Sequence, residues 1–324
     1  MSSWQEVRAY LRSHRYDLAT GFPAGLAGTP LLSRPEWTPA APIPLSSLEI
    51  SFARAPGCDL PVASGHPGYA SYSAAMAALD APTVFENRPT WRLLDADLAG
   101  PAPRLVFGDG WYFDSIDTGE AAAHEYAAAR LDGTPTPLRD AVTDPTDLRL
   151  RPANMAVSAL TVRGGDQFLL HWRDPAKVGH AGGLYQVVPV GVFQSSGPDD
   201  FDLWRFMLRE YAEELLGEPE VDAPDYETWP FATAMTAALD TGHLTAHVLG
   251  LGVDPLTYAT DLLVQVSIDT DTFDELFGAW VAVNDEGAVT MRPFTSTSTE
   301  GLPMQAAGAA LVRLALPRES RVQP

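Results

Sequence analysis

Three glutamates and one arginine within six residues make the strongest candidate for chemistry in this sequence. They lie in residues 199–218, DDFDLWRFMLREYAEELLGE, where apolar residues recur at spacings of three and four and predict a helix. On that helix Glu210, Glu213 and Glu214 share one patch, because residues three and four apart are neighbours. Their like charges repel, and Arg209 offsets part of this cost. A divalent cation offsets more, since Mg²⁺ prefers hard oxygen ligands.

The plainer interpretation of this patch is solvated helix surface, which is where most glutamate-rich helix faces lie. Its context favours chemistry, because a hairpin, a strand and a loop are predicted directly before it. Arg173, Lys177 and His180 fall in the loop between two of those strands. They can bind a phosphate or a base of a substrate, or they can be surface cations that offset an acidic neighbourhood.

The second half of a known motif is present in this helix. Residues 209–214 read Arg-Glu-Tyr-Ala-Glu-Glu, and with their surroundings they resemble the Nudix hydrolase superfamily over about half the chain. The family motif is Gly, five residues, Glu, seven residues, then Arg-Glu-(bulky)-x-Glu-Glu-x-Gly. The resemblance implies that Glu210, Glu213 and Glu214 bind Mg²⁺ or Mn²⁺ beneath a diphosphate and that Arg209 orients them.

The strand before the loop, VVPVGVFQ, resembles the Pro-Gly-Gly-x-x-Glu segment of the same family. Pro189 and Gly191 match that segment, whereas Val190 and Gln194 replace a Gly and a Glu. Gln194 offers a neutral oxygen where the family offers a charged one. We therefore place Gln194 among the expected substrate-binding residues, with Arg173, Lys177 and His180.

The first half of the motif departs from the family. Counting back from the arginine places the leading Glu on Phe201 and the Gly on Ser195, and the closing Gly comes one residue late, at Gly217. If the loop is longer than in the family, Asp200 or Asp202 can substitute for the missing Glu. Either of these acids, or one of the three glutamates, can then take a proton from the attacking water.

Other candidate sites have weaker support. His243 and His247 are four apart in or before a predicted strand, where such residues lie roughly 13 Å apart and cannot share one metal. Cys58 has no activating base in its sequence neighbourhood. Gly164 and Gly165 form a turn without the Lys-Ser/Thr of a phosphate-binding loop.

Composition excludes several classes of protein. The chain has 324 residues, 46% of them apolar, so it can bury a sizeable core. A formal net charge of −21 argues against binding to nucleic acid or to an anionic membrane. A single cysteine excludes an intrachain disulfide framework. Because the sequence shows neither an apolar signal region nor a stretch of about eighteen apolar residues, we expect a cytoplasmic protein.

Stretches rich in proline and glycine divide the chain into four segments. The expected fold class is α+β, with a smaller α+β N-terminal domain and a C-terminal domain for which the resemblance implies a Nudix-type α/β/α sandwich. The segments are an N-terminal helix and Pro-rich arm (1–45), a small α+β domain (46–132), a linker (133–152) and the Nudix-like domain (153–317). The arm is either disordered or lies across another surface.

Local patterns predict the individual elements. A helix is expected over 4–18. In the smaller domain the patterns predict strands at 48–55, 90–98 and 103–116 and helices at 71–79 and 118–131. In the larger domain they predict strands at 154–162, 167–172, 183–193, 244–253 and 261–269 and helices at 199–216, 273–277 and 304–316.

The helix at 118–131 has two interpretations. Thr118 is its expected N-cap, and Glu120, His124 and Glu125 lie on it. These residues faintly resemble a Nudix helix, so the N-terminal domain can be a degenerate copy of the same plan. Ordinary decoration of a helix surface is the alternative.

Three classes of function remain open. The first is a hydrolase, dependent on Mg²⁺ or Mn²⁺, that acts on a nucleoside diphosphate linked to another group. The second is a Nudix-fold ligand-binding or regulatory protein without hydrolytic activity, which Phe201 and Gln194 favour. The third is a protein-interaction module that uses the N-terminal domain and its arm. The resemblance also implies a homodimer, and the whole chain resembles a two-part group of actinobacterial proteins for which no activity is implied.

Overall fold

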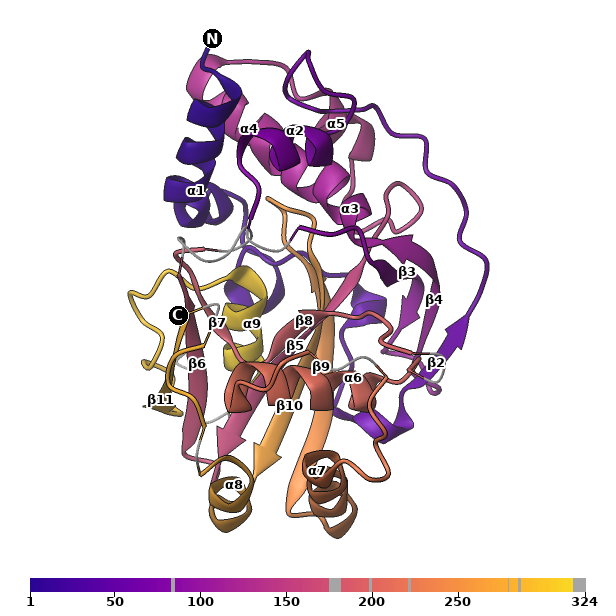
Figure 1. Cartoon of the computed structure of the whole chain (residues 1–324), viewed down its shortest axis with the longest axis vertical. Coiled ribbons are helices and arrows are strands. Elements are labelled where there is room, and N and C mark those ends of the chain that lie inside the picture. Colours follow the sequence, from indigo (N-terminus) through magenta and orange to yellow (C-terminus); the bar gives the residue numbers. More distant parts are fainter. Residues whose placement is uncertain are drawn as a thin grey trace.

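Two β-sheets of unequal size organise the chain in the computed structural model, which gives it a mixed α+β architecture (Figure 1). Four helices gather at one end of the molecule, which are α1 (Trp4–Thr20), α2 (Tyr72–Leu79), α4 (Ala121–Asp132) and α5 (Pro137–Val142). At the opposite end lie α7 (Pro230–Thr241) and α8 (Thr270–Phe277). The structure describes residues 1–82, 85–174, 182–197, 200–220, 223–278, 280–284 and 287–316.

The larger sheet has the strand order β1-β9-β10-β5-β6-β11, with β7 beside β6 and β8 beside β5. Only β10 and β5 run parallel; the other pairs are antiparallel. Its strands are β1 (Ile43–Pro44), β5 (Met155–Arg163), β6 (Gln167–Arg173), β7 (Tyr185–Val187), β8 (Val190–Val192), β9 (Leu244–Val253), β10 (Thr260–Ile268) and β11 (Gly287–Pro293).

Helices cover both faces of this sheet, because its central strands are apolar on both sides. On β10, Leu263 belongs to the core formed with α9 (Ala306–Ala315). Its neighbours Leu262 and Val264 belong to the other core. On this face of the sheet three helices contribute to that second core, which are α6 (Leu203–Tyr211), α7 (Pro230–Thr241) and α8 (Thr270–Phe277).

The smaller sheet has the order β2-β4-β3 and carries the N-terminal helices. Its strands are β2 (Glu49–Phe52), β3 (Pro89–Asp97) and β4 (Arg104–Trp111), and the helices are α1 (Trp4–Thr20), α2 (Tyr72–Leu79), α3 (Tyr112–Ser115), α4 (Ala121–Asp132) and α5 (Pro137–Val142). The free edge of β3 bonds to the larger unit, because Trp91 N–H donates to Phe193 O and Leu93 N–H to Ala153 O. One apolar core continues across this junction.

The proline-rich arm lies across the large sheet, which is the second of the two expectations for it. Leu32 forms a bridge with Val253, and β1 pairs with β9 through Ile43. Trp37 and Leu31 are buried there. The arm therefore continues the sheet beyond the edge of β9 through short elements, which are two 3-10 turns and the two-residue strand β1.

The expected N-cap at Thr118 is wrong, because the helix begins earlier. The segment starts at α3, where the Asp114 carboxylate accepts from Trp111 N–H at 2.8 Å. It then runs through a π-helical turn, Ile116–Glu120, into α4. The Thr118 hydroxyl lies inside this turn and donates to the Asp114 carbonyl.

The single strand expected over 183–193 is also wrong, because it is divided into β7 and β8 at Pro189. Pro189 has no N–H for a ladder, and the Val188 carbonyl accepts from the Thr161 hydroxyl at 2.7 Å. The two short strands therefore pair with different neighbours, β7 with β6 and β8 with β5. The patterns also missed α7 and β11, and α5 lies within the segment expected to be a linker.

The helix that carries the glutamates begins at Leu203, four residues later than expected. Asp202 caps it by accepting from Arg205 N–H at 2.8 Å. Its last turn, Ala212–Leu216, is π-helical, and Gly217 follows with φ +67°. This left-handed conformation is the one that the position of the glycine predicts.

Candidate functional site

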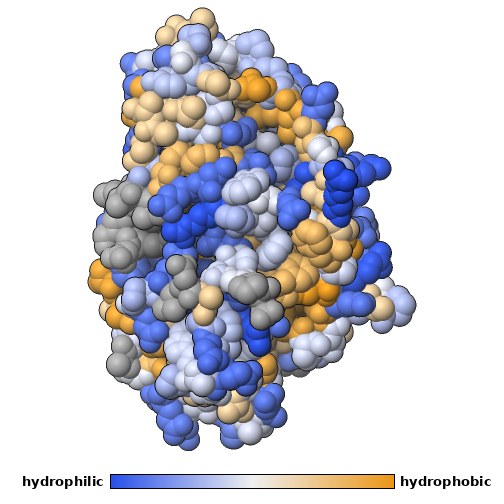
Figure 2. Space-filling view, turned by 45° about the vertical axis from the view of Figure 1, so that its right-hand side comes forward, coloured by the Kyte–Doolittle hydropathy of each residue, from blue (hydrophilic) through white to orange (hydrophobic). Residues whose placement is uncertain are grey.

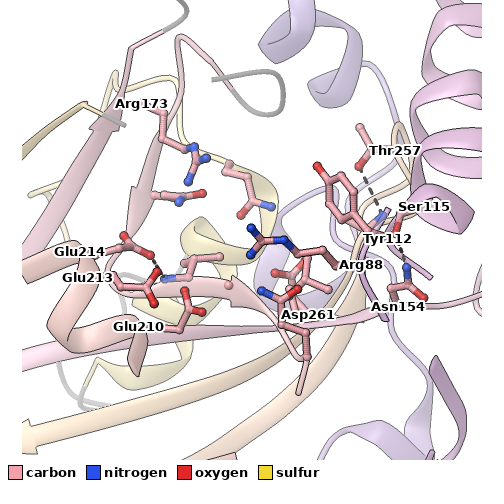
Figure 3. Close-up of a pocket in the computed structure, with 18 of the residues that line it drawn as sticks. Arg88, Tyr112, Ser115, Asn154, Arg173, Glu210, Glu213, Glu214, Thr257 and Asp261 are labelled. Carbon is pink, nitrogen blue, oxygen red and sulfur yellow. Dashed lines mark hydrogen bonds between the residues drawn. The ribbon is translucent and has the colours of Figure 1, made fainter. Parts of the chain in front are cut away.

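A cavity of about 960 Å³ opens where two strands of the large sheet diverge. β5 and β6 pair only next to their turn, at Val162–Phe168 and Arg163–Gln167. Beyond it β7 stays with β6, whereas β8 crosses to β5. The space between them is lined by residues from both sheets' units, and Figure 3 shows its two walls.

All three predicted glutamates line this cavity, on the wall that also carries Arg173 (Figure 3). Glu214 is buried, and one of its carboxylate oxygens accepts from Val190 N–H at 2.8 Å. The other oxygen lies 3.3 Å from His171 Nδ1. Glu210 and Glu213 are partly exposed. The spacing argument therefore placed the three carboxylates correctly on one surface.

Gly191 explains how Glu210 is seated. A β-carbon at residue 191 would lie 2.2 Å from the Glu210 carboxyl group, so the carboxylate rests directly on the backbone of β8. The Glu214 carboxylate accepts a hydrogen bond from the N–H of Val190, which directly precedes Gly191 in β8. Two of the three carboxylates thus lie against the same short strand, which is the strand that borders the opening of the sheet.

Arg209 does not line the cavity. It is buried and pairs with the buried carboxylate of Asp200, and it donates to Gln194 O at 2.9 Å. Burial alone would lower the pKa of Arg209, but Asp200 and Tyr226 beside it raise that pKa. These contacts tie the helix to the preceding loop, so the geometry favours an indirect orienting role.

Asp200 lies against Arg209 and is held by two further residues. Its Oδ2 accepts from Ser196 N–H at 2.8 Å, and its Oδ1 accepts from Tyr226 O–H at 2.8 Å. Phe201, at the counted position itself, packs against Trp91, Phe107 and Phe193. Asp200 thus pairs with Arg209, while Phe201 belongs to an aromatic cluster.

The other predicted site residues fall into two groups. Arg173 and Gln194 line the same cavity as the glutamates. Lys177 and His180 lie outside the described residues.

Hard oxygen donors face this cavity, which is the chemistry that Mg²⁺ and Mn²⁺ require. Within the described ranges, however, no group of three or more His, Cys, Asp or Glu side chains is arranged to hold a metal ion. A shared ion would therefore need a rotation of Glu210 or Glu213, the two partly exposed carboxylates.

The opposite wall of the cavity was not predicted from the sequence. It carries Arg88, Tyr112, Ser115, Asn154, Thr257 and Asp261 (Figure 3). A π-helical turn lies in each wall, Ile116–Glu120 on this side and Ala212–Leu216 on the other. Such turns occur frequently at functional sites.

Gly119 allows the N-terminal unit to pack closely against the segment around Thr257 in this wall. A β-carbon at Gly119 would lie 2.1 Å from the Thr257 carbonyl oxygen, so the two segments touch through their backbones. The adjacent Glu120 is buried and pairs with Arg8 and Arg15 of α1. The N-terminal unit therefore forms part of the cavity wall.

Asp261 is a buried acid on this wall whose pKa is strongly shifted. It is 2% exposed, and burial raises its pKa to about 7, with a contribution from Asp254. Ser158 opposes the shift by donating to Oδ1 at 2.8 Å. Oδ2 has no hydrogen-bond partner among the described residues. No sequence signal marks this residue, which stands at the start of an apolar strand.

One face of the molecule is polar across its middle. Figure 2 shows hydrophilic side chains gathered across the middle of the molecule, between more apolar regions. In the described part of the chain no helix combines the length and the apolar character that crossing a membrane requires.

Comparison with known proteins gives no family for this chain. No protein-family model matches it, and no curated protein matches it.

Proposed function

We propose that the chain is a divalent-metal-dependent hydrolase of a diphosphate-containing compound, such as a nucleoside diphosphate linked to another group, with a Nudix-type C-terminal sandwich. One observation carries the proposal: Glu210, Glu213 and Glu214 line a single cavity of about 960 Å³. A cavity of this size accommodates a ligand as large as a nucleotide. Three carboxylates without a cation repel an anionic ligand, so a bound cation would favour the binding of a diphosphate there.

The residues of the cavity have distinct roles in the proposed reaction. Glu210, Glu213 and Glu214 supply the oxygen ligands for Mg²⁺ or Mn²⁺. When bound, such an ion neutralises phosphate charge and lowers the pKa of a water molecule. Arg173, on the same wall, is placed to bind a phosphate oxygen.

The structure narrows the choice of proton acceptor for this reaction. Asp200 is engaged by Arg209, Tyr226 and Ser196, and Asp202 caps α6. Neither acid lines the cavity. We therefore assign one of the three glutamates as the base that accepts the proton of the attacking water.

A second candidate is a Nudix-fold protein that binds its ligand without hydrolysing it. Two observations favour it. Phe201 packs among aromatic side chains where the family has its leading glutamate, and the described carboxylates are not arranged as a metal group. This candidate requires the same cavity and the same phosphate-binding arginine but no metal.

A screen of diphosphate compounds separates the two candidates. Product release would be measured with Mg²⁺ and with EDTA for the wild type, Glu213→Gln and Glu214→Gln. The control is Glu227→Gln, an exposed glutamate that does not line the cavity. The hydrolase proposal predicts Mg²⁺-dependent turnover that falls about 100-fold or more in both site variants but not in the control.

The screen also has outcomes that contradict the hydrolase. Binding without turnover, unchanged by EDTA, would replace it with the ligand-binding candidate. Neither binding nor turnover of any diphosphate compound would reject both candidates.

A further inference from the structure

Arg151 is a buried cation without an acidic partner at the wall of the cavity. It is 2% exposed, and it lines the cavity beside Pro152, Tyr258 and Thr260. Its guanidinium donates to three neutral oxygens, which are Pro145 O at 2.8 Å, Pro152 O at 3.2 Å and Thr260 Oγ1 at 2.8 Å. Among the residues that the structure describes, it forms no ion pair with a carboxylate.

Burying such a charge is costly unless an anion compensates it. Burial, with a contribution from Arg92 nearby, lowers the pKa of Arg151 to about 10, so the side chain still carries its charge at neutral pH. A guanidinium has five N–H groups, and three are used. Two, one on each terminal nitrogen, have no acceptor in the described part of the protein.

Arg139 shows what a purely structural arginine looks like in the same neighbourhood. Both arginines stack on Tyr258, with the guanidinium carbon 5.0 Å from the ring for Arg139 and 5.6 Å for Arg151. Arg139 also donates to backbone carbonyls, those of Pro255 and Leu256. It does not line the cavity, whereas Arg151 does.

Arg151 is close in the chain and in its bonding to residues of the cavity wall opposite the glutamates. It lies three residues before Asn154 in the chain, and its bonding partner Thr260 is next to Asp261. Asn154 and Asp261 are on the wall formed with the N-terminal unit (Figure 3). The glutamates and Arg173 are on the other wall.

We propose that Arg151 binds an oxyanion of the ligand, a phosphate or a carboxylate group, at the end of the cavity remote from the glutamates. The inference rests on the proposed function for the diphosphate at the glutamate wall, and it deepens that function by defining the substrate class. The substrate carries a second anionic group, separate from its diphosphate. Arg151 has one N–H group on each terminal nitrogen without an acceptor among the described residues, and a guanidinium can donate to both oxygens of such a group.

The test uses metal-free binding, so that it does not depend on hydrolysis. Inorganic phosphate and malonate would be titrated in EDTA into the full-length wild type, Arg151→Gln and Arg139→Gln by calorimetry. We expect at least one of the two anions to bind, and Arg151→Gln to weaken that binding about tenfold or more. Arg139→Gln should change it by less than about twofold.

The two anions distinguish the possible sources of the charge. Tighter binding of phosphate indicates a phosphorylated substrate, and tighter binding of malonate indicates a carboxylic acid. No binding of either anion to the wild type would overturn the proposal, as would equal binding to the wild type and Arg151→Gln. Either failure leaves the Mg²⁺-dependent turnover of the diphosphate screen untouched, so the two proposals fail separately.

A second measurement covers the case in which Arg151→Gln does not fold. Crystals of the wild-type protein soaked with the better-binding anion should show it within hydrogen-bond distance of the Arg151 terminal nitrogens. An anion bound only elsewhere in the cavity, or none, would contradict the proposal.

Discussion

Replacement of Asp261 by Asn tests the electrostatics of the cavity wall quantitatively. The ordinary pKa of this carboxyl group is 3.8, and burial raises it to about 7 in the folded protein. The folded state therefore binds this proton more tightly than the unfolded chain does. As a result, the free energy of unfolding falls as the pH rises from about 4 to about 7.

The size of the effect follows from the pKa difference. Between about pH 5 and about pH 7 the free energy of unfolding falls by about 1.36 kcal/mol per pH unit. The raised pKa of Asp261 alone therefore lowers this free energy by about 3 kcal/mol over the range. Asn is close in shape to the protonated acid and has no charge to bury. The stability of Asp261→Asn relative to the wild type should therefore rise by about 3 kcal/mol between about pH 5 and about pH 8.

Urea unfolding followed by tryptophan fluorescence measures this difference, because the chain has 8 tryptophans. Asp109→Asn, which removes an exposed carboxylate on β4, corrects for the general effect of removing one negative charge. Parallel pH dependence of the wild type and Asp261→Asn would refute the reasoning. It would mean that Asp261 is ionised in the folded protein at low pH, in contact with solvent or a cation.

Two further predictions concern how the glutamate helix is held. Gly191→Ala places a β-carbon against the Glu210 carboxyl group, so Mn²⁺ affinity should fall about tenfold while the free energy of unfolding changes by about 1 kcal/mol or less. Gly57→Ala, where a β-carbon meets nothing within 4 Å, is its control, and equal Mn²⁺ affinity in both variants would contradict the assignment. Asp200→Asn removes one charge of a buried ion pair and should lower the urea-unfolding free energy by about 3 kcal/mol. Asp202→Asn keeps a good N-cap and should cost about 0.5 kcal/mol or less, so similar losses in the two variants would disprove this ranking.

Local patterns predicted the elements that depend on neighbouring residues. The hairpin of β5 and β6, the strands β9 and β10 and the helix α9 follow from periodicity and turn residues over short windows. The left-handed Gly217 follows from its place just beyond a helix. The spacing of Glu210, Glu213 and Glu214 likewise sufficed to place them on one cavity wall.

The departures came from long-range contacts, which short windows do not contain. The division of 183–193 into β7 and β8 depends on which strand each piece pairs with. The choice between Asp200 and Asp202 as a substitute for the missing glutamate was open in the sequence, and the pairing of Asp200 with Arg209 depends on how the loop folds back on the helix. α7 and β11 went unrecognised because their patterns are weak and their stability comes from packing against the sheet.

The opposite cavity wall shows a limit of a different kind. Arg151 stands in a proline-rich segment, and Asp261 precedes an apolar run, so both read as ordinary surface or strand-end charges. What distinguishes them is burial, which depends on two units of the chain closing on one another. Burial of a charge is a property of the assembled fold, and no spacing rule in one sequence expresses it.

Titration with Mn²⁺, followed by electron paramagnetic resonance, examines whether Glu210, Glu213 and Glu214 hold a divalent cation. The wild type should bind Mn²⁺, and the double variant Glu210→Gln/Glu213→Gln should lose at least about tenfold in affinity while keeping its fold. A wild type that leaves Mn²⁺ free in solution, or a double variant that binds it as tightly as the wild type, would contradict the metal-dependent site.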